Sequence, residues 1–83
     1  MTDITYTLTL LVRDAPGVLV RVAQVFARRG CNINSIHVMP HHDETWSSMV
    51  IAVRNVARMD QIVPQLEKLV DVKSVRVHEE EVS

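Results

Sequence analysis

The chain has 83 residues, of which 47% are hydrophobic, 4% aromatic and 23% charged, and its formal net charge is −1. This length is that of one small domain, and nine basic residues against ten acidic ones argue against nucleic-acid binding, which requires a basic surface. With one cysteine, the chain cannot form an internal disulfide bond. Its first residues lack a signal-peptide pattern. No apolar run approaches the roughly 18 residues of a membrane span. We therefore expect a cytoplasmic protein of a single domain, residues 1–83, that binds neither nucleic acid nor membrane.

The first half of the chain predicts a strand, a helix and a second strand. Residues 4–12 alternate and are rich in Thr, Ile, Leu and Val, which is typical of a strand with its even-numbered side chains toward a core. Residues 17–29 carry apolar side chains at helical spacing and are followed by Gly30, a residue type that commonly ends a helix. Residues 32–40 alternate again, but the alternation slips between residues 33 and 36, so a β-bulge is expected there.

The second half predicts a strand, a helix and a last strand. Residues 45–54 form the third expected strand. Residues 57–70 carry an apolar stripe at helical spacing on both sides of Pro64, and one helix is expected although an interior proline costs about 3 kcal/mol. Residues 72–78 predict the last strand, and the three glutamates at 79–81 are expected to form a frayed, solvated tail.

This order of elements predicts an α+β, ferredoxin-like fold of the βαββαβ type. Each βαβ unit takes a right-handed crossover, so the expected product is a four-stranded antiparallel sheet with two helices on one face. A chain of this size buries only about 60% of its unfolded surface, which favours an oligomer. The open face of the sheet is polar enough for solvent or for a partner, since it carries Thr5, Thr7, Thr9, Ser35, His37, Ser48 and Val50.

The turn between the first strand and the first helix, residues 13–19 (Arg-Asp-Ala-Pro-Gly-Val-Leu), is the main candidate for a binding site. A strand that enters a helix through a short turn with glycine leaves free backbone N–H groups and the positive end of the helix dipole beside a small pocket. Such a pocket suits the carboxylate of a small molecule. Two interpretations of Asp14 stay open. It either caps the helix by accepting from the Gly17 N–H, or faces the ammonium group of a ligand.

Asn32, at the entry to the second strand, is the second candidate. Its amide offers a donor and an acceptor, so it can hold either half of an amino acid zwitterion. It would meet the turn at 13–19 within one chain or across a dimer interface. The alternative is that Asn32 only supports the turn after the helix.

We expect no catalytic residue and no metal site in this chain. Residues 41–44 (His-His-Asp-Glu) are adjacent in a short hairpin and lack a metal-ligand spacing. Cys31 follows a helix C-terminus, whose negative dipole end disfavours a thiolate, so a small buried side chain is the better interpretation. No Ser-His-Asp arrangement, carboxylate pair or phosphate-binding loop is visible. Trp46 is interpreted as a strand-surface or interface anchor.

These segments together resemble an ACT domain, the small ligand-binding module of amino-acid metabolism. The resemblance is closest to the small, regulatory subunits of acetohydroxyacid synthase (acetolactate synthase). Besides the turn at 13–19, it rests on residues 29–36 (Arg-Gly-Cys-Asn-Ile-Asn-Ser-Ile), on the strand at 49–51 and on residues 68–72 (Lys-Leu-Val-Asp-Val). It covers residues 4–78.

The resemblance implies a regulatory domain that is not itself an enzyme. It implies a homodimer with side-by-side sheets, a large catalytic subunit that the chain activates, and feedback inhibition by valine or another branched-chain amino acid. Thiamine diphosphate, Mg²⁺ and FAD are expected in that catalytic partner and no cofactor in this chain. Carried over by position, the effector-binding residues are Asp14, Pro16, Gly17, Val18, Leu19, Asn32 and Ile33.

The chain departs from the resemblance at two points. Many relatives carry Asn where Asp14 stands, and a carboxylate there changes the charge at the expected ligand site. Longer relatives carry a second, C-terminal domain. The alternative function is a stand-alone ACT-type amino-acid sensor that acts on a different enzyme. Catalysis by the chain alone is disfavoured because no pair of acid, base or nucleophile can be named.

Overall fold

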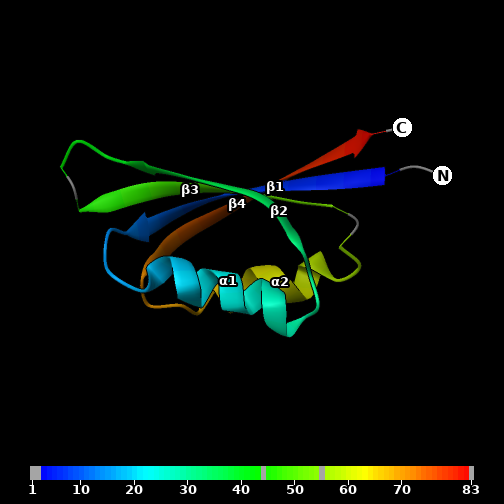
Figure 1. Cartoon of the computed structure of the whole chain (residues 1–83), viewed down its shortest axis with the longest axis horizontal. Coiled ribbons are helices and arrows are strands. Elements are labelled where there is room, and N and C mark those ends of the chain that lie inside the picture. The colour runs from blue at the N-terminus through cyan, green and yellow to red at the C-terminus, as the bar shows by residue number, and fades with distance from the viewer. Residues whose placement is uncertain (1–2, 44, 55, 83) are drawn as a thin grey trace.

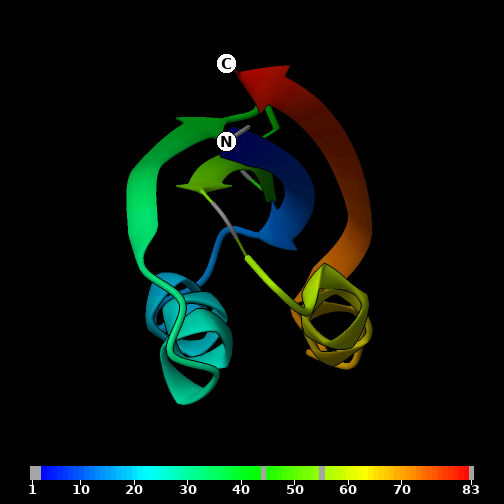
Figure 2. The same cartoon turned by 90° about the vertical axis from the view of Figure 1, so that its right-hand side faces the viewer.

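The computed structural model describes residues 3–43, 45–54 and 56–82. The predicted order of elements and the predicted fold class are confirmed (Figure 1). The described residues form one antiparallel sheet of four strands in the order β2-β3-β1-β4, and both helices cover the same face of it (Figure 2). The elements are β1 (Asp3–Arg13), α1 (Val18–Arg28), β2 (Ile33–Pro40), β3 (Trp46–Arg54), α2 (Met59–Glu67) and β4 (Val72–Val82).

The strand β1 lies in the middle of the sheet and sets its register. It pairs with β3 from Thr5 opposite Arg54 to Arg13 opposite Trp46, and it pairs with β4 on its other side. The bulge predicted at the start of the second strand is confirmed, since the register of β2 against β3 shifts between Ile33 and Ser35. The two edges of the sheet are therefore β2 and β4.

The core lies between the sheet and the two helices. Alternate residues of β1 and β3 point toward the helices, and the apolar stripes of α1 and α2 meet them. Phe26 is the one aromatic side chain among the buried core residues of the described chain, and its side chain is fully enclosed. The buried hydrophobic residues are Leu8, Leu10, Val12, Val18, Val22, Val25, Phe26, Met49, Ile51, Val53, Met59, Ile62, Leu66 and Val72.

Two predicted boundaries are wrong. The second helix was expected over 57–70 but covers Met59–Glu67, because the Leu69 N–H turns back to the Leu66 carbonyl and ends the helix. The glutamates at 79–81 were expected to form a frayed tail but belong to β4, opposite residues 4–6 of β1. The long first strand supplies backbone partners there, so pairing extends the edge strand despite the like charges.

Pro64 lies inside α2, as the apolar stripe predicted, and α2 remains one helix. Proline has no N–H to donate to the carbonyl of Asp60, one turn earlier, and its ring crowds that turn. We expect Pro64→Ala to raise the free energy of unfolding by about 1–3 kcal/mol. Urea denaturation followed by circular dichroism measures this. A loss of stability would show that the proline ring makes packing contacts worth more than the missing hydrogen bond.

Candidate functional site

The turn between β1 and α1 is held by backbone hydrogen bonds and by one glycine. The Asp14 N–H donates to the Thr45 carbonyl at 2.8 Å, and the Ala15 N–H donates to the Arg13 carbonyl at 2.9 Å. Gly17 is the N-cap residue of α1 and has a φ of 83°, in the left-handed region that favours glycine. The chain therefore turns sharply from the sheet into the helix at Gly17.

The first turn of α1 keeps free N–H donors. No side chain caps the helix, so the interpretation of Asp14 as the capping residue is wrong, and its carboxylate lies in the exposed turn. Within the part of the chain that the structure describes, the N–H groups of Gly17, Leu19 and Val20 make no hydrogen bond. The positive end of the helix dipole lies at the same place and also favours a negative charge there. This end of the molecule thus offers several N–H groups to an anionic group.

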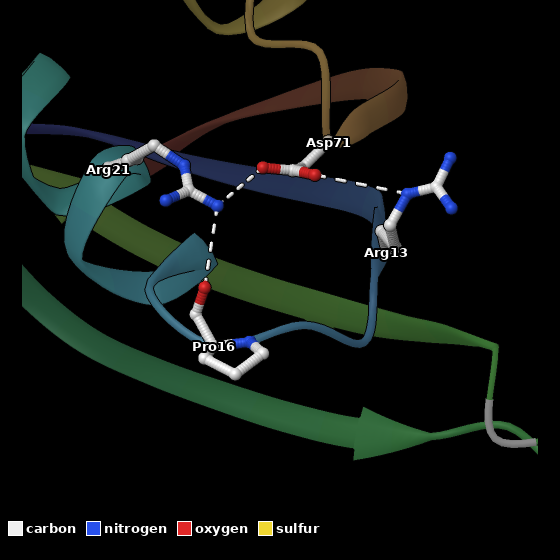
Figure 3. A network of polar contacts seen from close by, with 4 residues as sticks. All are labelled: Arg13, Pro16, Arg21 and Asp71. Carbon is white, nitrogen blue, oxygen red and sulfur yellow. Dashed lines mark hydrogen bonds and ion pairs between the residues drawn. The ribbon is translucent and has the colours of Figure 1, made fainter.

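An ion-pair network that sequence reasoning missed fixes the turn to the segment before β4 (Figure 3). Asp71 receives a hydrogen bond from Arg21 of α1, with an N–O distance of 2.5 Å, and its other oxygen lies 3.8 Å from Nε of Arg13. Arg21 also lies 3.5 Å from the Pro16 carbonyl, and the Arg13 N–H donates to the Asp71 carbonyl at 2.8 Å. Asp71 thus joins β1, the turn and α1. Residues 68–72 contribute only to the family resemblance, and no local pattern in the sequence pairs Asp71 with Arg21.

We expect Asp71→Ala to lower the free energy of unfolding by about 1 kcal/mol. Its side chain is only 15% exposed and accepts charge-assisted hydrogen bonds, but both arginines reach solvent, which reduces the gain. Asp60→Ala is the matched control, because Asp60 pairs with Arg58 in an exposed position and should lose less than about 0.5 kcal/mol. Urea denaturation gives the free energy of unfolding of both variants. Equal losses would mean that the network does not hold the turn.

The structure places the seven predicted site residues in two groups. Asp14, Pro16, Gly17 and Leu19 are exposed at the turn, whereas the side chain of Val18 is buried in the core, so only its backbone faces this site. Asn32 and Ile33 lie beyond the other end of α1, at the start of β2. The 11 residues of α1 separate the groups by roughly 16 Å. One chain alone therefore does not bring them together.

The other side chains considered from the sequence lie elsewhere on the surface. Trp46 is half-buried at the start of β3, with the Arg13 guanidinium at 5.5 Å and the Lys73 ammonium at 5.1 Å from the centre of its ring, so it lies on the strand surface. His41 is hydrogen-bonded to Ser48 at 2.8 Å. No group of three or more possible metal ligands is found among the described residues. None of the described helices has the length and apolar character needed to cross a membrane.

This βαββαβ arrangement, with both helices on one face of the sheet, is the fold of an ACT-type domain. The comparison with known families agrees with this class and narrows it. The chain belongs to the family described as the AHAS small subunit-like ACT domain, whose model matches residues 8–74.

Curated relatives carry the same description. The chain is 45% identical over 78 residues to the acetolactate synthase small subunit of Mycobacterium leprae, a match that covers 93% of this chain and 45% of that protein. It is 38% identical over 69 residues to the acetolactate synthase isozyme 1 small subunit of Escherichia coli K12, covering 83% of this chain and 72% of that protein. The chain spans about half the length of the mycobacterial relatives it matches.

Solved structures support the fold. The acetolactate synthase small subunit from Thermotoga maritima is similar with a TM-score of 0.76 and 39% identity, over 88% of this chain and 46% of that one. The ACT domain of the GTP pyrophosphokinase of Chlorobium tepidum has a TM-score of 0.73 at 15% identity, over 92% of this chain and 99% of that one. The second likeness concerns the fold alone.

Proposed function

We propose that this chain is a non-catalytic regulatory domain of acetohydroxyacid synthase. It binds the large catalytic subunit, raises its activity, and mediates feedback inhibition by valine or another branched-chain amino acid. The observation that carries the proposal is the match to the synthase small-subunit family over residues 8–74, nearly the whole fold. Thiamine diphosphate, Mg²⁺ and FAD belong to the catalytic partner in this proposal, and the chain itself supplies regulation.

The effector site in this proposal begins at the turn between β1 and α1. The free N–H groups of Gly17, Leu19 and Val20 receive the carboxylate of the amino acid. Asp14 is exposed in the same turn and faces its ammonium group. Leu19, which is 45% exposed, offers an apolar contact to a branched side chain. The uncapped start of α1 supports this arrangement because no side chain of the described residues competes with the ligand there.

A second copy of the chain completes the site in this proposal, because Asn32 and Ile33 lie at the far end of α1. In a twofold dimer the two α1 helices run in opposite directions, so the N-terminus of one approaches the C-terminal end of the other. The edge strand β2 supports such pairing: it carries no Lys, Arg, Asp or Glu, and exposed apolar side chains lie on it and on α1. These exposed side chains are Leu19, Val20, Val38 and Met39.

The experiment that tests the proposal measures directly how the chain binds the catalytic subunit and how it binds an amino acid. Sedimentation velocity gives the mass of the chain alone, and mixing it with the catalytic subunit of acetohydroxyacid synthase shows whether a complex forms. Isothermal titration with valine, leucine and isoleucine then identifies the effector. A dimer that binds the catalytic subunit and one of these amino acids supports the proposal. A chain that binds an amino acid but never the catalytic subunit would instead be a stand-alone sensor for another enzyme.

A further inference from the structure

A concave site lies at the end of α1 opposite the glycine turn. The loop from α1 to β2 and the segment that follows β3 meet there, because Ile33 of β2 pairs with Val53 of β3. Between them is a hollow of about 320 Å³, which we call the Arg29–Arg54 hollow. It is lined by Arg29, Gly30, Cys31, Asn32, Arg54, Val56 and Ala57.

The charge of this hollow is positive and is not neutralised within it. Among the residues that the structure describes, its lining includes two arginines and no acidic residue. Neither Arg29 nor Arg54 forms an ion pair or a side-chain hydrogen bond with any residue that the structure describes. Three arginines elsewhere in the described chain are paired: Arg13 and Arg21 share Asp71, and Arg58 pairs with Asp60.

Backbone donors are added to the two arginines. The N–H groups of Asn32, Val56 and Ala57 make no hydrogen bond with the described part of the chain. Two of the last carbonyls of α1 are already used, which reduces their repulsion of an anion: Phe26 accepts from the N–H groups of Arg29 and Cys31, and Ala27 accepts from that of Gly30. The loop after α1 thus satisfies part of the helix end, and the N–H groups of the hollow remain available to an anion.

Gly30 leaves room for a ligand to approach this backbone. Its φ is 67°, and a Cβ added to it would meet nothing within 4 Å, so the space beside it is open. The volume of about 320 Å³ is at the lower end of the range for small-molecule sites, which fits a small ion or a single acidic group. Arginine suits such a group because its planar fork binds two oxygens at once.

We propose that the Arg29–Arg54 hollow binds a small oxyanion, either a phosphate or a carboxylate group of a metabolite. The inference needs neither the catalytic partner nor the amino-acid effector proposed above. Asn32 is shared with the proposed effector site, but the two arginines and the segment at 56–57 are not. The hollow thus gives the chain a second anion site, which differs from the proposed effector site in its two arginines.

The test titrates the whole chain with inorganic phosphate and, separately, with malonate at constant ionic strength. Amide signals of Gly30, Asn32, Val56 and Ala57 in ¹H–¹⁵N NMR spectra are expected to shift and saturate. Arg29→Gln and Arg54→Gln should each weaken binding about tenfold, as expected for the loss of one charge-assisted contact. Tighter binding of phosphate than of malonate would identify a phosphorylated ligand, and the reverse order a carboxylate.

Arg28→Gln is the matched control, because Arg28 precedes Arg29 but does not line the hollow. The affinity of the Arg28→Gln variant for either anion should stay within about twofold of the affinity of the unmodified chain. Shifts that never saturate with either anion, or an Arg28 variant that loses as much as the Arg54 variant, would overturn the proposal. Valine titrated into the same samples reports on the residues of the glycine turn, so failure of the effector site and failure of this hollow are distinguished.

Discussion

Gly17→Asp is expected to abolish the binding of a branched-chain amino acid. The free N–H groups of Gly17, Leu19 and Val20 are the proposed carboxylate site, and an aspartate at the N-cap would itself accept from those of Leu19 and Val20. Its charge would also repel the ligand carboxylate. We expect a loss of at least about tenfold in affinity by isothermal titration, since one charge-assisted contact alone is worth that much.

Gly17→Asn separates this effect of charge from the effect on the backbone. Residue 17 has a φ of 83°, and a Cβ there would lie 2.9 Å from a guanidinium nitrogen of Arg21, which is flexible and has to move. Both variants therefore lose about 1 kcal/mol of folding stability. Only the aspartate adds a negative charge, so the asparagine variant should retain more affinity. Unchanged affinity in the aspartate variant would remove the turn from the effector site.

Phe26→Ala is expected to cost about 3–5 kcal/mol of folding stability. Phe26 is fully buried between the sheet and the helices, and no neighbour can refill the space of an aromatic ring. A domain of this size has only about 5–15 kcal/mol in total, so much of the variant should unfold in mild urea. The urea midpoint, followed by circular dichroism, gives the measurement.

Val70→Ala is the control for this loss. Val70 is 91% exposed in the segment between α2 and β4, so its truncation should change the stability by less than about 0.5 kcal/mol. A small effect of the Phe26 variant, comparable with that of the Val70 variant, would contradict the assignment of Phe26 to the centre of the core.

The elements of this fold follow from local patterns, which explains both the success and the errors of their prediction. Alternation and helical spacing locate all six elements because each pattern reflects a buried face. The same stripe runs on to Val70 and predicts too long a helix, since spacing does not show where the backbone hydrogen bonds change. Val70 has helical spacing but no contact partner to bury it. The strand pairing of residues 79–81 depends on β1, more than 70 residues earlier in the chain, and is invisible to a local pattern.

The candidate site was predictable in its parts and not in their arrangement. Asp14, Pro16 and Gly17 indicate a sharp entry to a helix, and that turn is present. The N-cap of α1 is Gly17 and not Asp14, because the chain turns into the helix at the positive φ of Gly17. Arg21 and Asp71 are 50 positions apart, so their ion pair requires the tertiary fold. The distance from Gly17 to Asn32 likewise follows only from the length and direction of α1.

The central claim is that this chain regulates acetohydroxyacid synthase. The most direct measurement is the activity of the catalytic subunit from the same organism, titrated with this chain, with and without valine. The account predicts that activity rises to a plateau with the chain and that valine, or another branched-chain amino acid, reverses the rise. Activity that does not change at any ratio of the two proteins would contradict it.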